Sequence, residues 1–300
     1  MLLVIMLMKL KRKILGTVRK RLNTLKLGEK SEPVLQDPRE FLYSNLIPRF
    51  TVELPVKKGR YLGWFDLDRE GFSPIILALH NWNQNGKNKE SFYGILALYA
   101  KVVVIDNPNK KLFFNSEFTV FPEKSEARRM IYPWDTGSVE SRYNEHLEKV
   151  RKENKKYGLM NSFESIGDIN SCSDKKLKME AERFCRLAES IGEYGYKKQP
   201  RGQISGSVYL AGPEYVWAVD GGHHRAPVLS YLGYERIPVV VRRFVRREEV
   251  AFWPQVVSGL YSEEAALHVF DNFFYSRQPD SFNEWKEHPV VEEIRRKNIK

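Results

Sequence analysis

Cysteine is scarce in this chain of 300 residues, with only Cys172 and Cys185 present. Two cysteines do not make the disulfide framework of a small secreted domain. Neither lies in a Cys-x-x-Cys motif or beside histidines at metal-binding spacing. We therefore expect reduced thiols in a cytoplasmic protein.

Long hydrophobic runs are also missing. The apolar stretch Met1–Met8 is far too short to span a bilayer. A signal peptide would carry its positive charges first and end in small residues, and this stretch does neither. Internal repeats and low-complexity tracts are not evident. A hydrophobic content of 42% and a charged content of 29% are typical of a globular protein with one large domain or two modest ones.

The formal net charge of +11 is unevenly distributed. Residues 1–28 hold eight lysines and arginines and no acid, which leaves +3 for the other 272 residues. The pI of about 9.4 is therefore weak evidence for a nucleic-acid-binding face. Apolar residues recur at helical spacing within this arm, at Leu10, Ile14, Val18, Leu22 and Leu25.

This pattern predicts a basic amphipathic helix over residues 1–27, followed by a linker that extends to residue 33. Such a helix suits an anionic membrane surface, and would place a cytoplasmic protein peripherally at the inner face of a membrane. The alternative is a helix that packs on its own protein body with its lysines solvated.

The sequence pattern over residues 34–135 predicts an accessory α/β region. The expected strands are 51–56 and 60–66 joined by a Lys-Lys-Gly turn, the buried strands 74–80 and 101–106, and the aromatic strand 111–121. A helix over 90–99 would connect the two buried strands as a parallel pair. Polar residues at His80–Asn83 would then follow a buried strand, either as a sugar-binding loop with Trp82 or as a plain capped loop.

Residues 136–250 are expected to form a second domain, in which residues 175–245 are the most readable block. We expect helices over 138–156, 177–194 and 226–233, and strands over 208–210, 215–219 and 237–242. Residues 251–300 predict a helical and aromatic C-terminal extension. The overall fold class is mixed α/β.

The stretch Val216–Arg225, VWAVDGGHHR, carries the clearest chemical signal. A strand, a glycine turn and a helix start present backbone N–H groups to an anion. Gly221 and Gly222 allow positive φ and close approach to a ligand. Arg225 offers a fork of donors that fits a phosphate. Asp220 would hold Mg²⁺ or accept a hydroxyl proton, and otherwise would cap the turn.

A longer pattern surrounds this loop. LAESIGEYGY (Leu187–Tyr196), the DGGHHR loop, a short helix ending at Gly233 and the strand IPVVV (Ile237–Val241) together resemble the ParB/sulfiredoxin superfamily over about residues 160–245. The resemblance implies that fold, with the loop as the binding site for nucleotide phosphates. It makes His224 the loop histidine of the family and places His223 at a variable position that faces solvent.

This sequence differs from the family motifs at several positions, and these differences reduce the number of activities that we expect. The catalytic cysteine of sulfiredoxins is His223 here, so sulfinic-acid reduction is not expected. The chain lacks a helix-turn-helix reader after the domain, so sequence-specific nucleic-acid binding is not expected either. The loop is most similar to that of free serine kinases, which use a glutamate between the first strand and the first helix as general base. Asp168, Asp174 or Glu180 would have to replace it.

The sequence therefore favours a nucleotide-dependent phosphotransferase that uses ATP, or CTP, with Mg²⁺ and a small hydroxyl acceptor. Asp220 and His224 are the candidate catalytic residues, and Asp220 is also the candidate metal ligand. The candidate nucleotide-binding residues are Gly221, Gly222, His223, His224 and Arg225.

The alternative is a nucleotide-binding switch or CTPase module that acts through protein partners. A nuclease is a third option, with no metal-ligand motif to support it. Four further arginines, Arg242, Arg243, Arg246 and Arg247, are interpreted as a solvated charge run.

Overall fold

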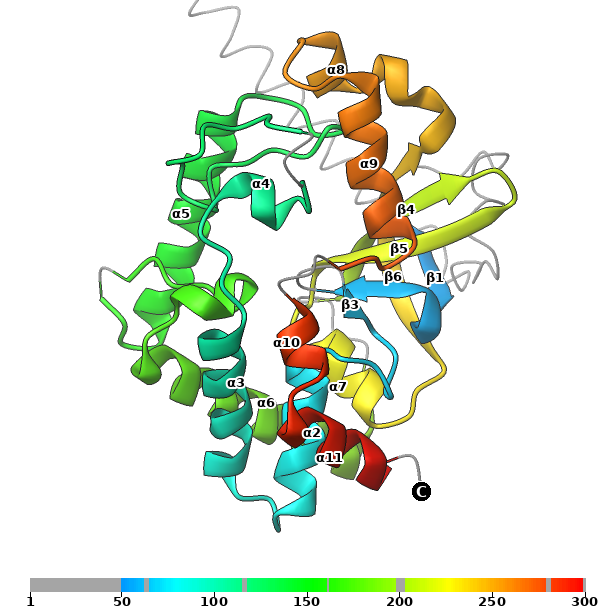
Figure 1. The fold of residues 1–300 in the computed structure, drawn as a ribbon. Helices are drawn as coiled ribbons and strands as arrows, with labels where there is room; N and C mark the ends of the chain where they lie inside the picture. Colours follow the sequence, from blue (N-terminus) through cyan, green and yellow to red (C-terminus); the bar gives the residue numbers. More distant parts are fainter. Residues whose placement is uncertain are drawn as a thin grey trace, which may run out of the picture. The chain divides into compact units, whose positions relative to one another are not determined.

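The computed structural model describes residues 50–61, 65–114, 118–160, 162–197, 203–278 and 282–298. All of these residues belong to one unit, Leu35–Lys300. The fold of this unit is mixed α/β, as the sequence predicts, with helices packed around one six-stranded sheet (Figure 1). The predicted amphipathic arm, residues 1–33, lies outside the described residues.

The sheet has the strand order β1-β6-β4-β5-β2-β3. Its strands are β1 (Phe50–Pro55), β2 (Gly59–Tyr61), β3 (Phe65–Asp66), β4 (Ser205–Ala211), β5 (Glu214–Gly221) and β6 (Arg236–Arg246). Antiparallel pairs join β1 to β6, β4 to β5 and β2 to β3, whereas β6–β4 and β5–β2 are parallel. The predicted strands after residue 205 are confirmed, and each is longer than its apolar stretch alone indicated.

The first two strands differ from their prediction. The Lys-Lys-Gly segment does not join β1 and β2 as neighbours, because β1 pairs with β6 and β2 pairs with β5. The strands lie on opposite sides of the β4–β5 hairpin in the sheet order. A short 3-10 helix, Val56–Lys58, carries the chain between them. Gly59 is required at its end, since an added Cβ would lie 2.5 Å from Leu67 Cδ1.

The helices lie above and below this sheet and to one side of it (Figure 1). They are α2 (Pro74–Gln84), α3 (Lys89–Val102), α4 (Pro108–Lys111), α5 (Val139–Lys156), α6 (Asp174–Tyr194), α7 (Arg225–Tyr231), α8 (Pro254–Val257), α9 (Glu263–Phe274), α10 (Asn283–Lys286) and α11 (Pro289–Asn298). Two further 3-10 segments are η3 (Ile166–Ser171) and η4 (Arg247–Phe252). In the part of the chain that the structure describes, no helix combines the length and the apolar character needed to cross a membrane.

Side-chain caps explain several helix starts. Ser138, Ser173 and Ser262 each accept a hydrogen bond from a backbone N–H in the first turn of α5, α6 and α9. Gly195 ends α6 with φ 72°, as its position after the apolar face predicts. The predicted helices 138–156 and 177–194 are therefore confirmed.

The predicted strand Pro74–His80 is wrong, because these residues form the first turns of α2. Every residue from Pro74 to His80 is buried, so the helix shows no polar face that would reveal its period. Pro74 stands at the helix start, where its missing N–H costs little. The loop expected at His80–Asn83 is helical for the same reason.

The other two strands of that region are also absent. Lys101 and Val102 end α3, and residues 103–107 are irregular. The predicted aromatic strand 111–121 begins in α4 and continues as irregular chain at its described positions. The aromatic side chains of this stretch are buried by packing rather than by strand pairing. Phe113 and Phe114 contact Phe282 and His268 from the C-terminal helical region.

Candidate functional site

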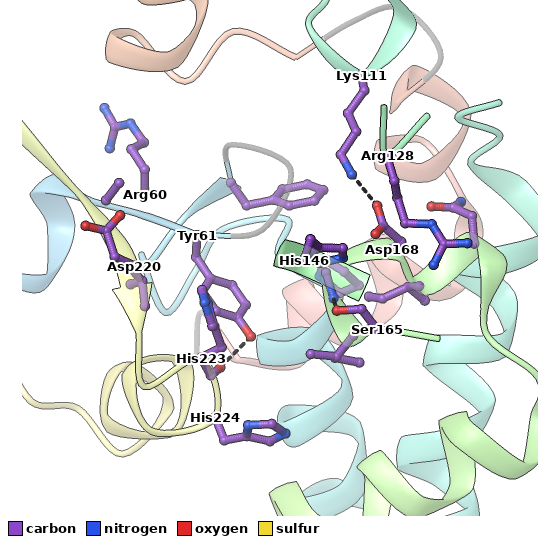
Figure 2. Close-up of a pocket in the computed structure, with 18 of the residues that line it drawn as sticks. Arg60, Tyr61, Lys111, Arg128, His146, Ser165, Asp168, Asp220, His223 and His224 are labelled. Carbon is purple, nitrogen blue, oxygen red and sulfur yellow. Dashed lines mark hydrogen bonds and ion pairs between the residues drawn. The ribbon is translucent and has the colours of Figure 1, made fainter. Parts of the chain in front are cut away.

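A pocket of about 1230 Å³ lies between the sheet and the helical part of the unit. Figure 2 shows two facing groups of side chains: Arg60, Tyr61, Asp220, His223 and His224 on the side of the sheet, and Lys111, Arg128, His146, Ser165 and Asp168 opposite. Asp220, Gly222, His223, His224 and Arg225 all line the pocket. The volume exceeds that of a typical small-molecule site and has room for two substrates.

Asp220 lies near the end of β5, where the strand meets the pocket. Its Oδ2 accepts a hydrogen bond from Ser207 Oγ at 2.5 Å. Burial raises its pKa above the ordinary value, although the Ser207 hydrogen bond and the Arg243 charge oppose the shift. Arg243 itself donates from Nε to Ser207 Oγ at 3.0 Å and from Nη1 to Asp135 at 2.5 Å. Asp220 is thus held in place by a network rather than left free to cap the turn.

The two glycines have different roles. Gly221 is the last residue of β5 and pairs with Ser205 across the hairpin, so it supports the loop without lining the pocket. Gly222 has φ 86°, and an added Cβ would lie 2.9 Å from Ile204 Cγ1. The tight turn after Asp220 therefore requires glycine at this position.

His223 is held within the site, contrary to the expectation that it faces solvent. Its backbone carbonyl accepts a 2.5 Å hydrogen bond from the hydroxyl of Tyr61. Its Nδ1 is buried without a hydrogen-bond partner among the described residues. Burial, together with the neighbouring His224, lowers its pKa to about 4, so the ring is neutral at physiological pH. The position carries a neutral imidazole with one unsatisfied nitrogen.

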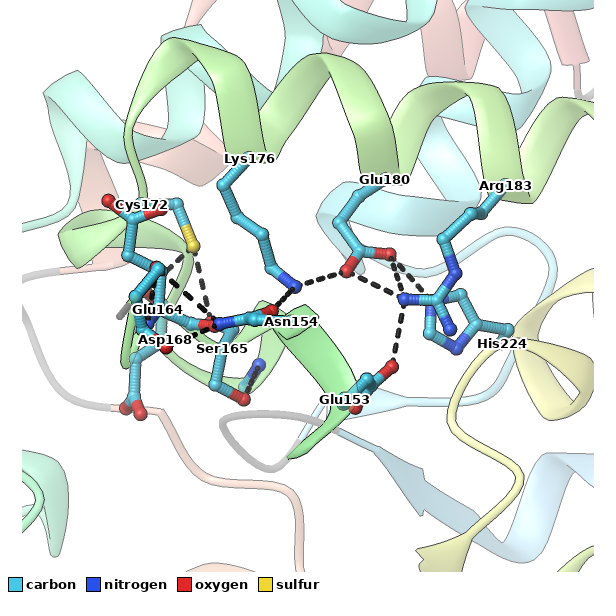
Figure 3. Close-up of polar contacts among 12 residues, drawn as sticks. Glu153, Asn154, Glu164, Ser165, Asp168, Cys172, Lys176, Glu180, Arg183 and His224 are labelled. Atoms are coloured by element: carbon cyan, nitrogen blue, oxygen red, sulfur yellow. Dashed lines mark hydrogen bonds and ion pairs between the residues drawn. The ribbon is translucent and has the colours of Figure 1, made fainter. Parts of the chain in front are cut away.

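His224 belongs to a buried polar network on α6 (Figure 3). Its Nε2 lies 2.6 Å from Glu180 Oε2, and its ring stacks on Phe184 at a centroid distance of 4.6 Å. Lys176 Nζ lies 2.8 Å from Glu180 Oε1 and donates to Asn154 Oδ1 at 2.8 Å. The His224 imidazole is therefore held at Nε2 by Glu180 and at its ring face by Phe184.

Glu180 is the centre of that network. Burial would raise its pKa, but the hydrogen bond from His224 and the charges of His224, Arg183 and Lys176 lower it to about 2. Arg183 Nη1 lies 3.0 Å from Glu180 Oε1 and 2.8 Å from Glu153 Oε1. One ionised carboxylate thus connects the loop to α6, and through Arg183 to α5.

Arg225 begins α7 and lines the pocket. The backbone N–H groups of Arg225 and Ala226 both donate to the Gly222 carbonyl, at 2.8 and 3.1 Å. These two amides already donate hydrogen bonds within the turn. An anion would therefore bind to the basic side chains rather than to the start of the helix. Arg183, Arg186 and other residues of one α6 face line the pocket near the loop.

The opposite wall carries an ion pair between Lys111 and Asp168. Burial would raise the pKa of Asp168, but the Lys111 charge and hydrogen bond hold it below its ordinary value. Asp168 therefore remains ionised at neutral pH. His146 lies behind it with Nε2 buried and unpartnered among the described residues, and burial lowers the pKa of this ring.

The described lining has an excess of positive charge. Seven basic side chains, Arg60, Lys111, Arg128, Arg183, Arg186, Arg225 and Arg243, face five carboxylates, Asp106, Glu126, Glu153, Asp168 and Asp220. Several of these basic side chains already form ion pairs, among them Lys111 with Asp168, Arg183 with Glu153 and Arg243 with Asp135, so the attraction for an anionic ligand is weaker than the count alone indicates.

Sequence reasoning missed most of these basic residues. Arg243 was interpreted as part of a solvated charge run, whereas it reaches the pocket and contacts Ser207 and Asp135. Strand alternation already separated Arg242 from Arg243, and the second of these lines the pocket. Lys111 and Arg128 come from irregular or misassigned segments, and no motif marked them.

The three candidate bases are now distinguished. Asp168 lines the pocket, whereas Glu180 is fully buried beneath its basic partners. Asp174, in the first turn of α6, interacts with Tyr93 and is not part of the described lining. Only Asp168 of the three is placed to meet a substrate.

Side chains that could ligate a metal ion are not clustered in the described part of the chain. The described residues hold no cluster of three or more histidine, cysteine or acidic side chains. Mg²⁺ in phosphoryl-transfer sites needs only one or two protein carboxylates, because substrate phosphates and water supply the remaining oxygens. Asp220 is one carboxylate of the pocket lining, and the charges of Arg243 and Arg242 act on it.

Comparison of the chain with protein-family models, with curated proteins and with solved structures finds no match.

Proposed function

We propose that this protein is a nucleotide-dependent phosphotransferase of the ParB/sulfiredoxin type. The observation that carries the proposal is the position of the DGGHHR loop: Asp220 and Gly222–Arg225 line a large pocket whose described lining is rich in arginine and lysine. ATP, or CTP, would place its phosphates against this loop. A small hydroxyl compound would occupy the space toward Asp168.

The arginines supply the electrostatic part of the mechanism. Arg225, with Arg186 from α6, would neutralise the phosphate oxygens of the nucleotide. Asp220 would hold Mg²⁺, which supplies further neutralisation of the charge on the phosphates. Gly222 permits the close turn, and His224 keeps its position through Glu180. This is catalysis by positioning and charge stabilisation.

The proton of the acceptor hydroxyl needs a base. Asp168 is ionised, lines the wall opposite the loop and is held by Lys111. It would accept the proton as the hydroxyl oxygen forms its bond to phosphorus and the bond to the leaving nucleoside diphosphate breaks. Asp220 is the second acid in the pocket, and its raised pKa makes it less fully ionised.

The direct test is phosphorus NMR of the full chain with Mg²⁺, ATP or CTP, and a panel of sugars, polyols and amino acids. A new phosphomonoester signal that depends on one acceptor is expected, and Asp168→Asn should lower its rate of formation by about 100-fold. Glu164→Gln, outside the described lining, is the matched control. Tight nucleotide binding without transfer to any acceptor would instead favour the switch module.

The N-terminal arm completes the proposal. Residues 1–27 would hold the enzyme at an anionic membrane surface, which suits an acceptor from envelope or polysaccharide metabolism.

A further inference from the structure

Tyr157 and Arg183 form a stacked pair at the edge of the pocket, called the Tyr157–Arg183 ledge below. Both residues line the pocket, and the Arg183 guanidinium lies 4.4 Å from the centroid of the Tyr157 ring. Tyr157 is 42% exposed, whereas the Arg183 side chain is only 15% exposed. The guanidinium covers one face of the Tyr157 ring, and the exposed remainder of the ring is the surface that a ligand can reach.

The ledge is rigid because carboxylates hold the guanidinium from two elements. Glu153 on α5 lies 2.8 Å from Arg183 Nη1, and Glu180 on α6 lies 3.0 Å from the same nitrogen. Tyr157 itself follows directly on α5, where its backbone N–H donates to Asn154. A fixed planar surface loses little conformational freedom when a second plane stacks on it.

The ledge is also connected to the loop. Glu180 contacts Arg183 through one side and His224 Nε2, at 2.6 Å, through the other (Figure 3). Two short contacts through one carboxylate therefore separate the ledge from the DGGHHR loop. A ligand with an anionic end and an aromatic end has the chemistry to use both.

We propose that the Tyr157–Arg183 ledge is the stacking subsite for the nucleobase of the nucleotide. This inference rests on the proposed function, because it assigns the base end of the ligand whose phosphates the loop would hold. Aromatic rings and guanidinium planes stack on nucleobases of every kind. The subsite therefore selects a nucleotide over an inorganic polyphosphate, while it discriminates little between ATP and CTP.

The test is calorimetric titration of the full chain with ATP, CTP and inorganic tripolyphosphate, each with Mg²⁺. Tyr157→Ala should weaken ATP and CTP binding by about 5- to 100-fold and leave tripolyphosphate binding unchanged. Tyr157→Phe should bind all three ligands as the wild type does. Tyr194→Ala is the matched control, since Tyr194 is 63% exposed and lies outside the described pocket lining.

The outcomes separate the subsite from the proposed function. If the wild type binds both nucleotides and folded Tyr157→Ala binds them equally well, the ledge is not the base subsite, while the loop proposal stands. Equal weakening of tripolyphosphate by Tyr157→Ala would also overturn the subsite. If the wild type binds none of the three ligands, the proposed function itself fails.

Discussion

At the scale of single residues, Asp220 shows the conflict between stability and function. Its side chain is exposed toward the pocket, and partial desolvation raises its pKa even though Ser207 and Arg243 stabilise the charge. A carboxyl group whose pKa rises on folding is costlier to ionise in the folded state than in the unfolded chain. The ionised Asp220 therefore destabilises the folded protein at neutral pH, and protonation at acidic pH removes this destabilisation.

Asp220→Asn should abolish phosphoryl transfer and slightly raise the melting temperature at pH 7, because the amide replaces a partly desolvated charge whose pKa is raised on folding. The gain should shrink as the pH falls through the raised pKa of the folded state and vanish below about 3.8, where both states are protonated. Scanning calorimetry of both proteins at several pH values measures this. A lower melting temperature for the variant at pH 7 would show that the charge stabilises the fold.

The ionisation of Glu180 has the opposite effect, because it stabilises the folded protein. Its pKa of about 2 lies below the ordinary value of 4.5, so its stabilising effect is complete above pH 4.5 and is lost as the pH falls toward 2. Lys176, Arg183 and His224 all depend on this one carboxylate.

Glu180→Gln should therefore reduce the free energy of unfolding by about 3–5 kcal/mol at pH 7, since it leaves buried positive charge without its counter-ion. Lys176→Met should cost less, because Glu180 keeps its other two partners. Urea unfolding of both variants provides the comparison. Equal losses, or a larger loss for Lys176→Met, would contradict the central position of Glu180.

At the scale of elements, the parts that the sequence predicted well have a visible period or a clear terminator. α5 has Ser138 as its cap, α6 has one apolar face and Gly195 at its end, and the β4–β5 hairpin has the Ala-Gly-Pro turn. α2 has none of these, because burial on all sides removes the polar face by which a helix is told from a buried strand. The loop residues were predictable for the same reason as the hairpin, since two glycines interrupt a strand.

The remaining site residues were not predictable because tertiary packing brings them together. Arg60 from β2, Lys111 from α4 and Arg128 from an irregular segment meet β5 in space without any sequence pattern that links them. The placement of Arg60 depends on a parallel β2–β5 pair between residues 158 positions apart, such as Gly59 and Trp217. Local spacing carries no information on such a pair.

α2 also contains an acid-sensitive residue. His80 is 4% exposed, its Nε2 lies 3.1 Å from the Arg69 carbonyl, and burial lowers its pKa to about 4. Between pH 6.5 and 4 the unfolded chain binds this proton and the folded chain does not, so stability falls as the pH falls.

His80→Gln should remove this part of the pH dependence. We expect the wild type to lose about 2–3 kcal/mol more than the variant between pH 7 and pH 4. Urea unfolding across this range measures the difference. Parallel pH profiles would show that His80 does not titrate in this way.

At the scale of the whole molecule, the pocket is lined by residues from both of the regions that the sequence separates, 34–135 and 136–250. Arg60 and Lys111 come from the expected accessory region 34–135, whereas Asp168, Asp220 and Arg225 come from 136–250. β1 and β2 also complete the sheet that β4–β6 begin. The catalytic proposal therefore concerns the unit as a whole rather than the loop-bearing segment alone.

The charge of the arm predicts a separate property. Lys9, Lys11, Arg12 and Lys13, replaced together by glutamine in the full chain, should reduce co-sedimentation with anionic vesicles by about 100-fold or more at 0.1 M salt. The matched control replaces Lys149, Lys152, Lys155 and Lys156 on the exposed side of α5. Equal effects of both sets would mean that only total charge matters.

The central claim is that the turn after Val219 binds phosphoryl groups inside the pocket, and equilibrium titration with Mg²⁺-ATP and Mg²⁺-CTP tests it most directly. The wild type should bind at least one of these nucleotides, and saturation at about 100 times the dissociation constant should stabilise the fold by about 2.7 kcal/mol. Arg225→Ala should lose this binding, and Arg246→Ala, which removes a guanidinium outside the described pocket lining, should keep it. Unchanged nucleotide affinity in folded Arg225→Ala would contradict the account.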